Sequence, residues 1–283
     1  MKAPPFAYVR AHSTAELFDV LDAHGGDARI LAGGQSLVAS LNLRLSEPRV
    51  LVDITHLPGL SGITVAGDVV TLGALTRHAD IASSETVRTH LPLLAQAVAH
   101  VAHPAIRNRG TIGGSLALND PAAEYPAVAV ALGATMVVRG RAGVRRVPAA
   151  QFFRGIYATA LTPDELLEAV EFPAQVPGQR SVFLELARRH GDYAMVGLAA
   201  HGTMQGGRAS GLRLVFLAVG DGPVEATDAA AVACDGVLLD RIVLAQAALA
   251  ANLQPSGDLN ASPATRLHLA RVLLGRALAR LAA

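Results

Sequence analysis

The sequence predicts an α+β protein in which a small α/β unit comes first, antiparallel hairpins follow, and the carboxyl end is helical. Three observations support this class. Helical and strand-like segments alternate in residues 1–57, short apolar strands separated by glycine turns recur between residues 63 and 220, and leucine repeats at helical spacing in residues 262–281. The 283 residues are enough for two compact units, each with its own apolar interior.

Composition narrows the classes of function. Hydrophobic residues make up 51% of the chain and the net charge is +1, which argues against a chain that neutralises nucleic-acid phosphates. The longest nearly uncharged run, residues 127–138, is shorter than the ~20 residues of a membrane span. No secretory signal opens the sequence, so we expect a cytoplasmic protein without a membrane span. The single cysteine, Cys234, excludes an internal disulfide and cannot alone hold an iron–sulfur cluster, which takes about four thiolates.

The first unit is predicted from helix-end signals and short apolar runs. Ser13 stands three residues before Glu16, which is the spacing of a capping box, and Gly25 ends the helix that this box begins. Residues 29–31 and 50–54 are apolar runs of strand length. Together these signals predict a small α/β unit.

The next segments are predicted to alternate between hairpin and helix. Residues 63–72 form a hairpin around a glycine turn. Thr76 is expected to cap a helix through Ile81, and apolar residues at helical spacing in 93–101 predict another helix, which Pro104 stops.

Strands and one helix start are predicted in the middle of the chain. Residues 136–138 and 145–147 have the composition of strands. Residues 162–165 read Thr-Pro-Asp-Glu, with an N-cap, a proline at the first helical position and an acid at the third, so a helix is predicted to start here. Residues 171–179 contain two prolines and a glycine and are the best candidate for a domain boundary.

The last part of the chain begins with strands and ends with a helix. Residues 196–204 and 212–219 are strand-like, and the three glycines within residues 206–211 mark the turn between them. Ser262 and Pro263 begin the final helix, whose leucines form one apolar stripe. The basic residues of this helix are predicted to point toward water: Arg266, Arg271, Arg276 and Arg280.

Two glycine segments are the candidate binding loops. Residues 32–36 read AGGQS after a strand, and residues 111–115 read TIGGS. In each, two residues without Cβ lie beside hydroxyl or amide side chains, so backbone N–H groups can point at an anion. Arg107 and Arg109 precede the second loop, where they would shape it or offset phosphate charge. One Gly-Gly pair is more often a turn, but two such loops indicate a single diphosphate.

Three other groups receive structural interpretations. His100 and His103 have the spacing of a metal pair, but no third ligand shares that spacing, so we expect polar residues at a helix end. Asp53 ends a strand, where it either caps the next turn or reaches a ribose hydroxyl, and we leave it outside the site. A basic cluster is expected to be a solvated hairpin tip, with a docking surface for another subunit as the alternative: Arg139, Arg141, Arg145 and Arg146.

Four segments together resemble the FAD-binding medium subunit of molybdenum hydroxylases, the xanthine dehydrogenase and carbon monoxide dehydrogenase family. They are AGGQSL at 32–37, IRNRGTIGGSLA at 106–117, DPAAEYPA at 120–127 and ARRHGDYAMVG at 187–197. The resemblance implies a two-subdomain FAD-binding domain of the PCMH/vanillyl-alcohol-oxidase type in residues 1–175, with subdomains at about 1–57 and 58–175. A C-terminal domain with an antiparallel sheet and packed helices would occupy residues 176–283.

The resemblance also implies a set of cofactor-binding residues, none of which is itself catalytic or a metal ligand. The set is Ala32, Gly33, Gly34, Gln35, Ser36, Thr111, Ile112, Gly113, Gly114, Ser115, Asp120, Glu124, Leu161 and Tyr193. The two loops would hold the FAD diphosphate, and Glu124, with Asp120 beside it, would accept hydrogen bonds from sugar or ribityl hydroxyls. Leu161 and Tyr193 would lie near the isoalloxazine; without the resemblance they read as core residues. Glu185 lies near a position where some relatives carry a lysine.

The resemblance implies an electron-transfer function within a complex. A large subunit with a molybdopterin cofactor would oxidise the substrate, which is carbon monoxide, a purine or other N-heterocycle, or an aldehyde. A small subunit with two [2Fe–2S] clusters would pass electrons to FAD, and NAD, a quinone or dioxygen would receive them. The expected assembly is (αβγ)2. The alternatives are a stand-alone FAD-dependent oxidoreductase of the same fold, such as the UDP-N-acetylenolpyruvoylglucosamine reductase type, and a non-catalytic assembly subunit.

Overall fold

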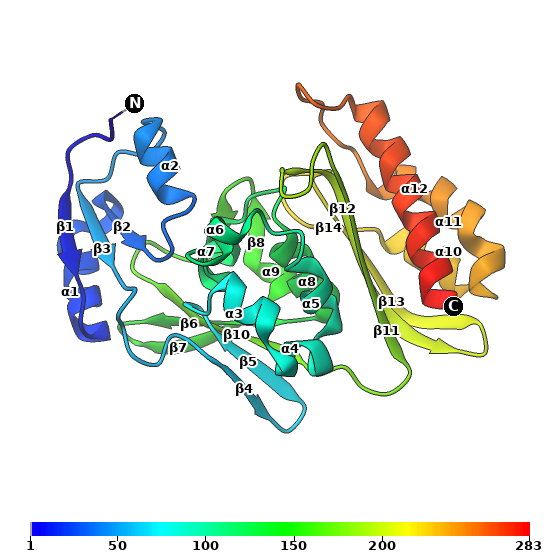
Figure 1. The fold of residues 1–283 in the computed structure, drawn as a ribbon, viewed down its shortest axis with the longest axis horizontal. Coiled ribbons are helices and arrows are strands. Elements are labelled where there is room, and N and C mark those ends of the chain that lie inside the picture. Colours follow the sequence, from blue (N-terminus) through cyan, green and yellow to red (C-terminus); the bar gives the residue numbers. More distant parts are fainter. Residues whose placement is uncertain (1) are drawn as a thin grey trace.

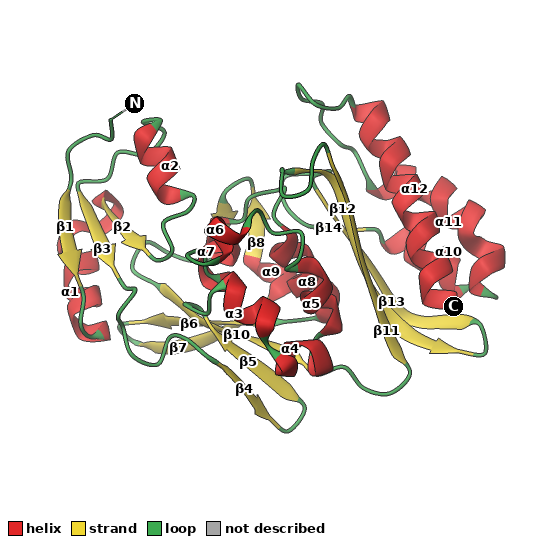
Figure 2. Ribbon diagram, viewed as in Figure 1, coloured by secondary structure: helices red, strands yellow, loops and turns green. Residues whose placement is uncertain are grey.

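The computed structural model of the chain describes residues 2–283 and divides into three bodies arranged in a row (Figure 1). A small sheet with its helices lies at one end, a five-stranded sheet with helices on one face lies in the middle, and a four-stranded sheet backed by long helices lies at the other end (Figures 1 and 2). Within residues 2–283, none of the helices is both long enough and apolar enough to cross a membrane.

The first body is a three-stranded parallel sheet in the order β1-β3-β2. Its elements are β1 (Ala7–Arg10), α1 (Thr14–His24), a short 3₁₀ turn (Gly25–Asp27), β2 (Ala28–Leu31), α2 (Leu37–Asn42) and β3 (Val50–Asp53). The predicted capping signal is present, because the Ser13 hydroxyl accepts a hydrogen bond from the N–H of Glu16. Gly25 ends α1 with φ at +52°, as the sequence predicts for this unit.

The middle body is built on an antiparallel sheet in the order β4-β5-β10-β6-β7. Its strands are β4 (Ile63–Ala66), β5 (Val69–Gly73), β6 (Thr135–Gly140), β7 (Gly143–Pro148) and β10 (Leu166–Pro173), with a small hairpin of β8 (Phe153–Gly155) and β9 (Ala158–Thr159). Its helices are α3 (His78–Ser83), α4 (Glu85–His90), α5 (Pro92–Ala97), α6 (Pro104–Arg107), α7 (Ile112–Leu118), α8 (Glu124–Leu132) and α9 (Ala149–Phe152).

One predicted helix and one predicted helix cap in this body are wrong, whereas the helix through Ile81 is present as α3. The N–H of Thr162 does bond to the carboxylate of Glu165, yet the chain continues as β10, the central strand, because residues 166–173 pair with both β5 and β6. A local capping signal is thus overridden by non-local pairing. The hydroxyl of Thr76 bonds to the N–H and carbonyl of Gly62, so α3 begins after Arg77 instead.

The third body is an antiparallel sheet in the order β11-β12-β13-β14. It contains β11 (Gln179–Ala187), β12 (Ala194–Gln205), β13 (Arg208–Leu217) and β14 (Val224–Glu225), followed by α10 (Thr227–Cys234), α11 (Leu238–Asn252) and α12 (Pro263–Ala282). Gly206 and Gly207 form the predicted turn. Gly211 does not; it lies inside β13 with φ at +58°, where the pairing register shifts, and so forms a bulge.

Helix α8 lies between the second and third sheets. Successive residues of the β12 and β13 strands point to opposite sides, so Ala199 and Val215 pack in the same core as α8, whereas Ala200 and Leu214 pack against α10–α12. All residues of α8 after Glu124 are buried, which explains an apolar run without a polar face. Glu124 is therefore a carboxylate at the end of an otherwise apolar helix.

The predicted basic cluster is ion-paired within the chain. The pairs are Arg139 with Glu168, Arg141 with Asp19 and Asp22, Arg145 with Glu165, and Arg146 with Glu171. Arg141 extends from the β6–β7 hairpin to α1, at 2.7 Å from each carboxylate, and so links the middle body to the first. The cluster is thus neither a purely solvated tip nor a set of free cations.

Arg266 corrects the predicted polar face of the last helix. Its side chain is buried and donates to the carbonyl of Ala218 and to the carboxylate of Asp258. The guanidinium therefore joins the start of α12 to the end of β13 and does not point toward water.

We expect Arg266→Ala to lower the free energy of unfolding by about 2 kcal/mol, because it leaves the buried Ala218 carbonyl without this donor and removes a partly exposed ion pair to Asp258. Arg276→Ala, at an exposed arginine of the same helix, should change it by less than about 0.5 kcal/mol. Urea unfolding of the two variants measures both values. Equal losses would contradict the role assigned to Arg266.

Candidate functional site

The first glycine loop, residues 32–36, joins β2 to α2. Gly34 has φ at +72°, a left-handed conformation that favours glycine, and the side-chain amide of Gln35 donates to the Gly33 carbonyl at 2.9 Å. Within residues 2–283, the backbone N–H groups of residues 33–36 have no hydrogen-bond acceptor. Consecutive free N–H groups in a tight loop form a nest for an anion.

The second glycine segment, residues 111–115, is the beginning of α7 and differs from the predicted nest. The N–H groups of Ile112 and Gly113 donate to the carbonyls of Thr76 and Ala74 at 3.0 and 2.8 Å. Those of Gly114 and Ser115 donate to the hydroxyl and carbonyl of Thr111, each at 3.1 Å. The expectation that this backbone points its N–H groups at a ligand is therefore wrong for these residues. The groups of this segment that remain available to a ligand are the hydroxyl of Ser115 and the first turn of α7.

The two segments lie against each other through glycine. A Cβ on Gly33 would lie 2.3 Å from the carbonyl oxygen of Arg109 and 2.8 Å from the Cα of Gly110. A Cβ on Gly113 would lie 2.4 Å from the Cβ of Ala74, at the end of β5. Gly33 therefore permits contact between the two loops, and Gly113 permits contact between α7 and the middle sheet.

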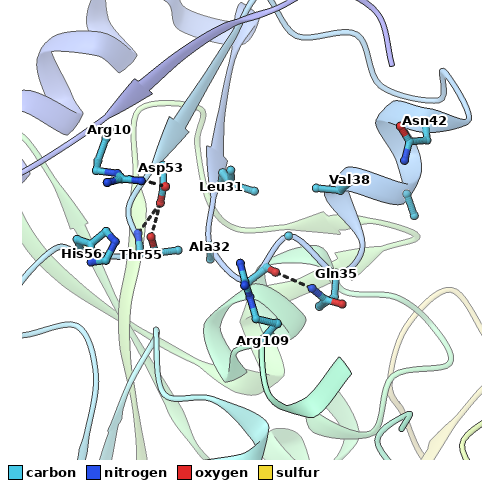
Figure 3. A pocket seen from close by; sticks show the side chains of 13 residues that line it. Arg10, Leu31, Ala32, Gln35, Val38, Asn42, Asp53, Thr55, His56 and Arg109 are labelled. Atoms are coloured by element: carbon cyan, nitrogen blue, oxygen red, sulfur yellow. Dashed lines mark hydrogen bonds and ion pairs between the residues drawn. The ribbon is translucent and has the colours of Figure 1, made fainter. Parts of the chain in front are cut away.

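A cavity of about 530 Å³ opens beside the first loop (Figure 3). Residues 32–35 of the predicted set line it, together with Leu31 and Val38, which point toward each other from β2 and α2, and Arg109 at the junction with the second segment (Figure 3). Ser36 and residues 111–115 are outside its lining. The cavity thus combines an apolar wall, free N–H groups and a cation, which suits a nucleotide better than a simple anion.

The two arginines before the second segment have separate roles. Arg107 donates from Nη1 to the carbonyls of Val101 and Ala102, at 2.9 Å each, and so fixes the turn before α6. The Arg109 side chain lines the cavity and has no hydrogen bond or ion pair within residues 2–283. Arg107 shapes the loop and Arg109 is the available cation.

Asp53 forms the opposite polar side of the cavity, shown in Figure 3. Its carboxylate accepts from the N–H and hydroxyl of Thr55, at 2.8 and 2.6 Å, and from the hydroxyl of Tyr8. Burial would raise the pKa of Asp53, but these hydrogen bonds outweigh burial and the pKa is lowered. The predicted turn-capping role is present, and it orients a charged carboxylate toward the cavity rim.

A second group of predicted residues gathers at the other end of α7, which is about 10 Å long at 1.5 Å per residue. The carboxylate of Asp120 accepts from the N–H of Ala122 at 2.9 Å. Burial raises the pKa of Glu124 to about 7, and the Asp120 carboxylate adds to the rise. Burial also raises the pKa of Glu185 to about 8, and Glu124 adds to that rise. Glu124 and Glu185 therefore share a poorly solvated region, and the Asp120 carboxylate lies close to Glu124.

Glu185 is the member of this group that the sequence did not assign. It lies on β11, in the third body, and one of its carboxylate oxygens is buried without a hydrogen-bond partner. The resemblance points to this part of the chain only through the expectation that some relatives carry a lysine near Leu184 or Glu185. The sequence does not predict that Glu185 is buried beside Glu124, because this burial depends on the contact between α8 and the third sheet.

The two remaining predicted residues have different surroundings. Leu161 is half-buried against the main core, at the base of the β8–β9 hairpin. Tyr193 precedes β12 and 76% of its surface is exposed, so the interpretation of a buried tyrosine is wrong. The two histidines that we expected to be polar residues at a helix end differ in burial: His100 is half-buried and packs against Phe183, and His103 is exposed.

Two family descriptions match the chain. "FAD binding domain in molybdopterin dehydrogenase" matches residues 4–175, and "CO dehydrogenase flavoprotein C-terminal domain" matches residues 181–281. Together they span the three bodies from β1 to α12.

Individual proteins match over the same length. The 6-hydroxypseudooxynicotine dehydrogenase complex subunit alpha of Paenarthrobacter nicotinovorans is 39% identical over 282 residues, 99% of this chain and 95% of that protein. A carbon monoxide dehydrogenase structure from Hydrogenophaga pseudoflava has a TM-score of 0.96 at 36% identity, covering 99% of this chain and 98% of that one. Quinoline 2-oxidoreductase from Pseudomonas putida 86 has a TM-score of 0.94 at 40% identity, covering 100% and 98%.

We expect Gly33→Ala to separate the two loops, because a Cβ there meets the Arg109 carbonyl oxygen at 2.3 Å and backbone cannot move aside cheaply. The loss in unfolding free energy should be about 2 kcal/mol or more. Gly26→Ala, where a Cβ meets nothing within 4 Å, is the matched control. Thermal unfolding compares the two. A Gly33→Ala protein as stable as the control would contradict the close contact.

We expect Glu185 to contribute less stability to the folded chain as pH rises from 4.5 toward 8, its ordinary and raised pKa values. Below pH 4.5 both states hold the proton; between the two values only the folded state holds it, so deprotonation favours unfolding. Glu185→Gln should flatten this dependence, by an amount below the limit of about 1.4 kcal/mol per pH unit for one proton. Urea unfolding of the ligand-free chain across this pH range measures the slope, with Glu47→Gln as an exposed control. Parallel slopes would show that Glu185 titrates normally.

Proposed function

The chain belongs to the family of FAD-binding medium subunits of molybdenum hydroxylases, and we propose that its two loops and its carboxylate group hold the FAD through which electrons leave the complex. Its relatives are dehydrogenase subunits, so this chain is an FAD-binding component of a multi-subunit oxidoreductase with large and small partner subunits. An (αβγ)2 assembly and a cytoplasmic location stay predictions. Because relatives of full length are subunits of complexes, the stand-alone oxidoreductase is not favoured.

The diphosphate site rests on one observation: the N–H groups of residues 33–36 are free and lie beside Arg109. A dinucleotide diphosphate brings two negative charges into such a nest, where N–H donors and a guanidinium replace lost water. A Cβ on Gly34 would meet Leu31 and Val38 at 3.3 Å each, so glycine keeps the loop close to these apolar side chains. The hydroxyls of Ser36 and Ser115 are the additional donors that we assign to phosphate oxygens.

The other end of the cofactor is assigned to the far end of α7. Asp120 and Glu124 lie there, separated from the second loop by the length of α7, about 10 Å. This separation suits a dinucleotide bound in an extended conformation. Glu124, with a pKa of about 7, can accept a hydrogen bond from a ribityl or ribose hydroxyl once ionised. We assign Leu161 and Tyr193 to packing against the planar ring system.

FAD, when bound, can accept electrons singly and release them in pairs, which suits it to link one-electron clusters to a two-electron acceptor. The chain's own residues bind and orient it. Glu185, mostly protonated below its pKa of about 8, adds little negative charge to the region of the ring at neutral pH. Glu124 is the residue whose charge would respond to ligand binding there.

We expect the isolated chain to bind FAD in a one-to-one ratio and Arg109→Gln to weaken this binding roughly 10- to 100-fold, because a charge-assisted contact to phosphate is lost. Arg44→Gln, at an exposed arginine of the first body outside the lining of the cavity, should bind FAD as the unchanged chain does. Titration of the apoprotein with FAD, followed by flavin fluorescence, measures both constants. A chain that binds no FAD under these conditions would refute the proposal, whereas equal affinities in the two variants would refute only the placement of the diphosphate.

A further inference from the structure

The tip of the β8–β9 hairpin has a conformation and a surface that core packing does not explain. Ile156 and Tyr157 are 56% and 61% exposed, side by side on the same tip. Tyr157 has φ at +54°, in the left-handed region that residues with a Cβ seldom adopt. Strained residues of this kind persist where surrounding structure enforces them, and they concentrate at binding sites.

Asn119 is the residue that enforces this tip. It is fully buried, it ends α7, and its side-chain amide donates to the carbonyls of Gly155 and Ala158 at 2.7 and 3.0 Å. Its backbone carbonyl accepts from the N–H of Tyr157 at 3.3 Å. Three hydrogen bonds made by one buried residue thus hold three hairpin residues against the end of α7.

The same buried residue fixes the hairpin relative to the proposed flavin region. Asp120 follows Asn119 directly, and the carbonyl of Pro121 accepts from the N–H of Ala218 in the third body at 2.8 Å. Partial burial raises the pKa of Tyr157, and the Asp120 carboxylate and then Tyr193 add to the rise, so these three side chains lie within electrostatic reach. The hairpin thereby places the exposed Tyr157 near Asp120, and the exposed Tyr193 lies near the same carboxylate.

An exposed hairpin residue has a simpler explanation, which is that nothing covers it. That explanation accounts for the exposure of Ile156. It does not account for a strained backbone at Tyr157 held by a buried amide, because a glycine at this position would adopt the same φ without strain. A large, exposed aromatic side chain at this left-handed position points to a contact made by its ring.

We propose that Tyr157 is a second aromatic contact for the flavin ring system, opposing Tyr193 across the same region, and that Asn119 is the positioning residue that holds it there. This inference rests on the proposed function. The ligand chemistry is that of a planar heteroaromatic ring, which two tyrosines from different bodies can flank. Leu161, at the base of the same hairpin, would contact the same ring.

The chain offers a direct optical test, since it contains no tryptophan and only four tyrosines, Tyr8, Tyr125, Tyr157 and Tyr193. A phenol in contact with an excited flavin quenches its emission by electron transfer, and phenylalanine does not. We expect the emission lifetime of bound FAD to lengthen on the order of twofold in Tyr157→Phe and in Tyr193→Phe, since each keeps the ring but removes one of the two phenol electron donors that flank the flavin. Tyr8→Phe, beside Asp53 at the other end of the site, should leave the lifetime unchanged.

A second variant tests the positioning residue. Asn119→Gly keeps the left-handed helix end, which glycine adopts readily, but removes both bonds to the hairpin carbonyls. We expect FAD to stay bound and its lifetime to lengthen, although all four tyrosines remain. Circular dichroism and thermal unfolding confirm that each variant is folded before lifetimes are compared.

The outcomes separate the inference from the function on which it rests. If FAD binds, Tyr193→Phe lengthens the lifetime and Tyr157→Phe does not, the second contact is refuted and the flavin site stands. If Tyr8→Phe alone lengthens the lifetime, the ring lies in the cavity of the first body and both placements fail. If the folded, unchanged chain binds no FAD, the proposed function fails before this test begins.

Discussion

The contact between Gly33 and the backbone of Arg109 and Gly110 is the constraint on which the site depends. It allows a loop of the first body to touch the entrance of α7 in the middle body without any side chain between them. Gly110 in turn lies over His78, where a Cβ would come within 2.6 Å of the imidazole. Burial and then the nearby Arg107 lower the pKa of His78 to about 4, so this imidazole is neutral and adds no charge under the junction. The anion nest and Arg109 can share one cavity only because this contact is so close.

This constraint also explains which glycines the sequence can and cannot assign. A Gly-Gly pair predicts that backbone comes close to something, but the partner is decided by tertiary structure. In the first loop the partner is another loop, and the N–H groups are left free; in the second, Gly113 faces Ala74 and its N–H is already bonded. Both segments fit the same local pattern. Only the packing of α7 on β5 distinguishes an open nest from a helix start.

The fold shows the same division between local and non-local signals. Caps such as Ser13, turns such as Gly206 and the leucine stripe of the last helix are local, so the sequence predicts them. The Thr162–Glu165 cap is an equally good local signal for a helix. The residues that follow nevertheless form β10, because they pair with β5 and β6, and this pairing between distant segments outweighs the cap. Likewise the charge of Arg266 predicts exposure, whereas its partners lie in a distant strand end and loop.

The residues of the candidate site come from all three bodies of the chain. The first and middle bodies supply the free N–H groups and Arg109, whereas Glu185 and Tyr193 come from the third. Helix α8 joins the two regions, because its apolar length is buried between two sheets and its single carboxylate emerges at the end near Asp120. Burying that helix fixes Glu124 beside Glu185, and the low polarity around them raises both pKa values. The packing that stabilises the third body therefore also raises the pKa values of these two carboxyl groups, independently of the contacts around the first glycine loop.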